Sequence, residues 1–99
     1  MPSDARAARV RFLTTDEGGR RTAPMSGVRS QIELGGFQSS CVVEDLTGRT
    51  DLPLGQSIEV QIRIIFEDWA GPAFARAKAV ELYEGDKLVA TGEFHPPKD

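Results

Sequence analysis

Alternation of apolar and polar side chains between Ser57 and Phe66, broken only at Ile65, is the feature that most constrains the fold. Glu59, Gln61 and Arg63 separate apolar residues that occupy every second position. A two-residue period places the two sets on opposite faces of a β-strand, whereas a helix would need a period of about 3.6. The segment therefore predicts a strand with one buried face. The apolar set is Ile58, Val60, Ile62, Ile64 and Phe66.

Shorter alternating runs predict further strands on either side of this segment. Residues 8–13 and 28–34 alternate clearly, and residues 37–44 place Phe37, Cys41 and Val43 on one face. A later run carries Phe74, Val80 and Leu82, and the last covers residues 88–94. The alanines between Phe74 and Ala79 would favour a helix. We interpret them as strand, because the alternation continues directly into Val80.

Glycine and proline mark the connections between these runs. Gly35–Gly36 and Glu84–Lys87 are typical of tight turns, the latter of a β-hairpin. Residues 46–56 form a longer connection, and Trp69–Pro72 interrupt the chain before the later runs. About six short strands joined in this way indicate an all-β fold, a small closed antiparallel β-barrel.

The chain of 99 residues predicts one domain, with an ordered core over about 8–95 and frayed ends at 1–7 and 96–99. Hydrophobic content of 39% and charged content of 27% are typical of a soluble protein. Neither a membrane span nor a secretory signal is visible, so we expect a cytoplasmic location. The expected buried residues are Val10, Phe12, Ile32, Val43, Ile58, Val60, Ile62, Ile64, Leu82 and Phe94.

The sequence offers no combination of groups that indicates catalysis. Cys41 is the only cysteine and lies in phase with apolar neighbours, which is typical of a core residue. His95 is the only histidine and lies near the C-terminal end. Adjacent carboxylates such as Glu44 and Asp45 point apart on a strand. We therefore expect no enzyme, no metal site and no cofactor.

Basic residues gather in the first third of an otherwise acidic chain. Six arginines lie within residues 1–31 against three acidic residues, although the whole protein carries a formal charge of −3. Arg20, Arg21 and Arg29 with Gln31 would suit RNA phosphates, because a guanidinium forms two parallel charge-assisted bonds. The alternative is an exposed loop in which Asp16 and Glu17 neutralise these arginines.

Three aromatic residues surround the break at residues 69–72: Phe66, Trp69 and Phe74. They would form either a plug at one end of the barrel or an exposed anchor for a protein partner, since aromatic residues are favoured at interfaces. The pattern favours the plug, and the anchor stays open.

Several motifs, taken in order, resemble the C-terminal β-barrel domain (domain three) of elongation factor Tu. The first is Asp16–Arg20 (DEGGR), followed by Thr22 and Pro24 and by Gly27–Gln31, which has the pattern Gly-x-Arg-x-Gln. The resemblance continues with Leu52–Gln56 and the hairpin Tyr83–Gly92, and covers nearly the whole chain. It implies a closed barrel of translation-related type.

In that family the domain contacts a GTPase domain, an exchange factor and aminoacyl-tRNA. By resemblance, Arg20, Gln31 and the hairpin Gly85 would face RNA, and Arg21 replaces the family's histidine. A phosphate-contacting lysine of the family is replaced at Phe66–Glu67. The chain has no phosphate-binding loop, so no bound nucleotide is expected. Together these observations predict a non-enzymatic module that binds a protein partner or itself; the alternative is weak RNA binding.

Overall fold

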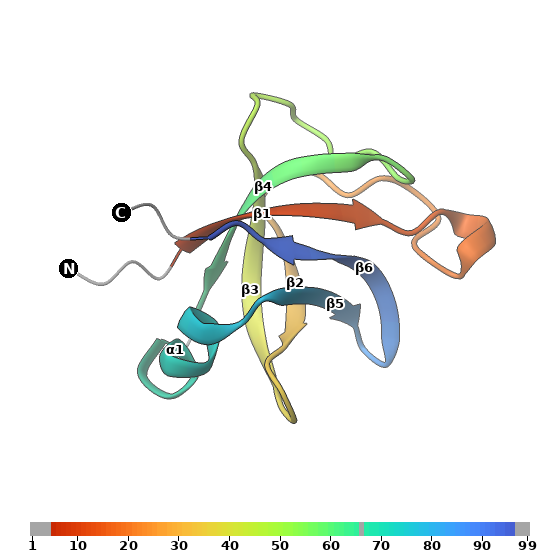
Figure 1. Cartoon of the computed structure of the whole chain (residues 1–99). Coiled ribbons are helices and arrows are strands. Elements are labelled where there is room, and N and C mark those ends of the chain that lie inside the picture. Colours follow the sequence, from red (N-terminus) through yellow and green to blue (C-terminus); the bar gives the residue numbers. More distant parts are fainter. Residues whose placement is uncertain (1–4, 66, 97–99) are drawn as a thin grey trace.

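The computed structural model describes residues 5–65 and 67–96, which form one barrel with a short helix at one end (Figure 1). The single α-helix of this part is α1 (Glu67–Arg76), and a turn of 3-10 helix covers Thr15–Glu17. The strands are β1 (Ala5–Phe12), β2 (Val28–Glu33), β3 (Gln38–Asp45), β4 (Ser57–Ile64), β5 (Ala79–Glu84) and β6 (Lys87–Phe94).

All neighbouring strands are antiparallel, and their order around the barrel is β1-β4-β3-β2-β5-β6. Closure comes from the pairing of β6 with β1, where Val10 lies opposite Gly92. Each strand therefore has a partner on both sides, although β2 and β5 pair at only two positions, Gln31 with Tyr83 and Ile32 with Leu82. The predicted closed antiparallel barrel of six strands is confirmed.

The alternating side chains fill the interior as the two-residue period requires. In β4, Ile58, Val60, Ile62 and Ile64 are buried while the residues between them are not. Phe12, Ile32 and Leu82 are fully buried as well. Each of the ten predicted core residues is buried, and each contributes roughly 1.5–3 kcal/mol before the entropic cost of folding.

The main departure from the expected structure is α1. The sequence predicted strand from Phe74 onward, whereas Phe74 lies inside the helix and β5 begins only at Ala79. Ala70 and Phe74, four residues apart, are buried on the same helix face, and Ala73 and Ala77 pack partly against the core. The helix covers one open end of the barrel, so burial of this face offsets the cost of Pro72 within it.

Strand β1 begins at Ala5, three residues before the predicted ordered core. The side chain of Arg6 holds this end in place: its Nη1 donates to the backbone carbonyls of Phe74 and Ala77, each at 2.7 Å. The guanidinium carbon also lies 4.1 Å from the ring centre of Phe94. Arg6 thus caps the last turn of α1, where carbonyls otherwise lack partners.

The connections follow the predicted turn residues. Gly35 and Gly36 between β2 and β3, and Gly85 between β5 and β6, adopt positive φ of 84°, 114° and 63°. In the loop after β1, Thr14 and Glu17 form a reciprocal capping box around the 3-10 turn. These glycines therefore provide the positive φ angles that the turns require.

Candidate functional site

A pair of aromatic rings, one exposed and one packed partly against the core, lies at the end of the barrel covered by α1. Trp69, in the first half of the helix, is 56% exposed, and Phe37 at the β2–β3 turn is half-buried. Their ring centroids are 5.0 Å apart with the planes tilted by 40°. We call Trp69 and Phe37 the aromatic patch. The favoured interpretation of Trp69 as a barrel plug is wrong, because most of its side chain faces solvent.

The two other predicted anchors do not join this patch. Phe74 is 2% exposed and packs edge-to-face on Phe94, with ring centroids 5.4 Å apart, so it belongs to the core. Phe66 lies outside the described residues. Phe37 takes their place beside Trp69, and sequence reasoning missed it. Its alternation with Cys41 and Val43 indicated only a strand, and no local pattern indicates that a turn and a helix meet.

The predicted arginines do not form one cluster. Arg20 pairs with Glu84 of β5, and the loop carboxylate Glu17 pairs with Arg11 at 3.0 Å. The alternative in which Asp16 and Glu17 neutralise the loop arginines is therefore wrong about the partners. Arg20 is neutralised, but by Glu84. Arg21 is exposed, and the part of the chain that the structure describes contains no ion pair to it.

Gln31 and Arg20 both lie near the β5–β6 hairpin, which contains Gly85. Gln31 lies opposite Tyr83 in the β2–β5 pairing, and Tyr83 is two residues before Gly85. Arg20 is tied to this hairpin through Glu84. The amide of Gln31 is engaged, since its Nε2 donates to Ser40 Oγ at 3.0 Å. Burial raises the pKa of Tyr83, and the negative charges of the neighbouring Glu81 and Glu33 raise it further. This surface therefore carries negative charge as well.

A second basic residue lies near Arg29 on the outer wall. Arg29 of β2 is opposite Val42 of β3, and Val42 is opposite Arg63 of β4. These side chains follow one another across three strands on the outward face. Neither arginine has an ion pair within the described residues. Sequence reasoning placed Arg63 on the polar face of its strand but could not place it beside Arg29, because strand register is not visible locally.

Cysteine and histidine are not brought together. Cys41 is fully buried, and burial raises the pKa of its thiol to about 12, far from that of a reactive thiolate. His95 instead contacts Glu59, with 2.5 Å between Nε2 and Oε1. The full burial of Cys41 agrees with its interpretation as a core residue.

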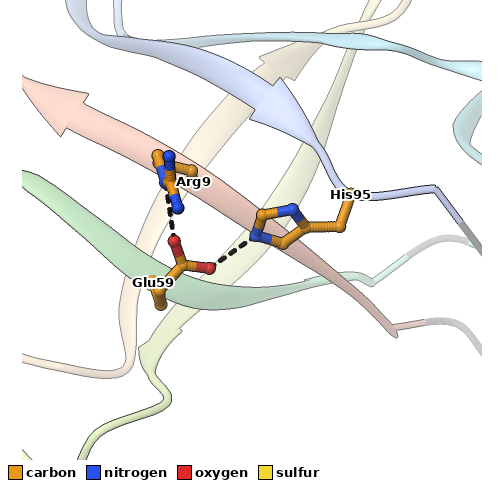
Figure 2. Close-up of polar contacts among 3 residues, drawn as sticks. All are labelled: Arg9, Glu59 and His95. Carbon is orange, nitrogen blue, oxygen red and sulfur yellow. Dashed lines mark hydrogen bonds and ion pairs between the residues drawn. The ribbon is translucent and has the colours of Figure 1, made fainter.

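Glu59 lies at the centre of a three-residue polar cluster on the outer wall (Figure 2). Its Oε2 accepts from Arg9 Nε at 2.7 Å, while its Oε1 faces His95. These hydrogen bonds from Arg9 and His95 lower the pKa of Glu59. The cluster joins β1, β4 and the residue after β6. Both carboxylate oxygens are therefore engaged, and the cluster links three segments of the outer wall.

Two negative findings apply to the described residues. Nowhere in ranges 5–65 and 67–96 do three or more His, Cys, Asp or Glu side chains gather in a way that would hold a metal ion. In the same ranges, α1 is neither long nor apolar enough to cross a membrane.

Comparisons with known proteins assign no family to the chain. No protein-family model matches it, and no curated protein matches it. A proposal of function therefore rests on the surfaces described above.

Proposed function

We propose that this protein is a non-enzymatic binding module that recognises a protein partner through the aromatic patch of Trp69 and Phe37. The observation that carries this proposal is the 56% exposure of Trp69, the single tryptophan of the chain, beside a second aromatic ring. Tryptophan combines a large apolar area with one N–H donor, and it is among the residues that contribute most at interfaces.

The closed barrel restricts the ways in which such a partner could bind. A sheet edge can accept an added strand from another chain, but every strand here already has two neighbours. A partner, whether another protein or a second copy, must therefore contact side chains and loops. The aromatic patch suits this because it lies where the β2–β3 turn meets α1, outside the strand pairing.

Replacing Trp69 with alanine is expected to abolish retention of the partner while leaving the fold intact, because the side chain contributes little to the core. The measurement is affinity capture followed by mass spectrometry, with light scattering to detect self-association. Met25→Ala is the matched control, since Met25 is also exposed, at 69%, but lies in the loop before β2. Equal retention by the Trp69→Ala and wild-type proteins would contradict the proposal.

The resemblance to the third domain of elongation factor Tu stays a prediction, and a translation-related role is proposed on that resemblance alone. A cytoplasmic location is proposed from the ordinary composition and the single cysteine of the chain. The barrel that it implies is present, but a shared fold does not carry a function with it. The support for binding comes from the exposed aromatic patch. That support is independent of the resemblance.

A second candidate is weak RNA binding through Arg29 and Arg63, which follow one another across β2, β3 and β4, with the exposed Arg21 of the loop after β1 as a further contact. The observation in its favour is that these arginines lack ion pairs within the described residues, in contrast to Arg20. Three phosphate contacts predict a log–log salt slope of about −2 to −3 for the association constant. Fluorescence anisotropy with a short RNA measures this slope.

Arg29→Ala is expected to reduce the magnitude of that slope by about one unit. The control is Arg49→Ala, which removes the same charge from the loop after β3, where Arg49 lies 3.8 Å from Asp51. Equal effects of the two variants would show that net charge alone governs binding, and would reject this surface.

A further inference from the structure

A hollow of about 370 Å³ lies where the end of α1 and the start of β5 approach the ends of the barrel seam. Figure 1 shows α1 on the same side of the barrel as the start of β1 and the end of β6. Arg6, Arg76, Lys78 and His95 line the hollow, with Glu93 as the single acidic residue among its described lining. Three charged basic side chains, together with His95, whose Nε2 contacts Glu59, thus line one hollow of a protein whose overall charge is negative.

Arg6 is a half-buried positive charge without an acidic partner among the described residues. Its Nη1 binds the carbonyls of Phe74 and Ala77, and its plane lies near the Phe94 ring. Burial lowers the pKa of this guanidinium. Charges removed from water are normally paired, so Arg6 leaves an uncompensated charge in the wall of the hollow. By binding the carbonyls it also offsets the negative end of the helix dipole, which would otherwise repel an anion.

The charges of the lining favour a dianion. Arg6, Arg76 and Lys78 contribute three positive charges and Glu93 one negative charge, which leaves two positive charges when His95 is neutral. A phosphate monoester carries about −1.5 to −2 at pH 7. Its organic part would meet the apolar portion of the wall, which includes Phe94. A volume of about 370 Å³ lies within the range of small-molecule sites.

A neighbouring hollow shows the contrast. It shares Arg76 and Lys78 and measures about 430 Å³, but Glu33 and Glu81 also line it, so its charges balance. Of these two hollows, the one beside Arg6 combines an excess of positive charge with a guanidinium that has no ion pair among the described residues. We propose that this hollow binds a small phosphate monoester, with Arg6, Arg76 and Lys78 contacting the phosphate oxygens. This proposal does not rest on the binding of a protein partner.

Nuclear magnetic resonance titration of the labelled protein with phenyl phosphate at constant ionic strength tests the site. We expect amide shifts concentrated at residues 76–79 and 93–95. Arg76→Ala and Lys78→Ala should each weaken binding about tenfold, as expected for the loss of one charge-assisted bond. Both side chains are exposed, so these variants should fold. Lys87→Ala, which removes one charge from the distant β5–β6 hairpin, should leave the affinity unchanged.

Inorganic phosphate, used as a second probe, should shift the same amides but bind more weakly, because it lacks the ring that meets the apolar wall. Equal affinity for both probes would overturn the assignment to an ester. Absence of shifts at about 1 mM phenyl phosphate would overturn the site itself. Equal weakening by Lys87→Ala would do the same, since it would show non-specific attraction.

Discussion

Replacement of Gly92 by alanine is expected to destabilise the protein by about 3 kcal/mol. Gly92 lies in β6 opposite Val10 of β1 and Val80 of β5. A Cβ atom at this position would lie 2.1 Å from the backbone oxygen of Arg9 and 2.7 Å from the Cα of Val10. Both are backbone atoms, so no side-chain rotation relieves the overlap.

The physical reason is that β1 and β6 approach closely along the seam that closes the barrel. The added methyl group would force these strands apart and weaken their hydrogen bonds. Urea unfolding, followed by circular dichroism, measures the free energy of unfolding. Gly85→Ala is the control: nothing lies within 4 Å of its added Cβ, and only the positive φ of 63° opposes the change, at a cost of about 1 kcal/mol. A Gly92→Ala protein as stable as Gly85→Ala would contradict the described closure.

Replacement of Arg6 by alanine is expected to cost about 2–4 kcal/mol, because it removes two charge-assisted hydrogen bonds to carbonyls of α1. It also removes the contact with the Phe94 ring. The loss should appear locally as faster hydrogen exchange in α1 and globally as a lower unfolding free energy. Arg6→Lys should recover only part of the stability, since an ammonium lacks the planar fork of arginine.

Arg9→Ala provides the matched control on the same strand. Arg9 is 60% exposed and pairs with Glu59 at the surface, where ion pairs contribute little. We expect a much smaller change in stability and no change in the exchange of α1. Indistinguishable behaviour of Arg6→Ala and Arg9→Ala would show that Arg6 does not anchor the helix.

The barrel could be predicted from the sequence because the patterns that indicate its strands and turns each lie within a short stretch of the chain. The alternation in β4 and the turn glycines at 35, 36 and 85 each depend on a few neighbouring residues. The helix α1 was missed because Gly71–Pro72 indicated a break and because the alanines after Phe74 fit either period. A helical signal was nonetheless present in the spacing of Ala70, Ala73, Phe74 and Ala77.

The candidate sites depend on contacts between distant segments, which a single sequence does not reveal. Trp69 was identified as an aromatic of interest, but its partner Phe37 belongs to a turn far away in the chain. The contact between Arg6 and the carbonyls of Phe74 and Ala77 likewise joins residues that are 68 and 71 positions apart in the sequence. Charge counting found the basic first third of the chain but not which arginines are neutralised.

Photocrosslinking from position 69 tests the proposed protein-binding surface most directly. A photoreactive phenylalanine analogue replaces Trp69 in one protein, and Met25 or Arg21 in two controls that also expose the probe. The account predicts discrete crosslinked protein adducts from position 69 that are absent from both controls. Adducts to RNA from position 21, with none to protein from position 69, would contradict it.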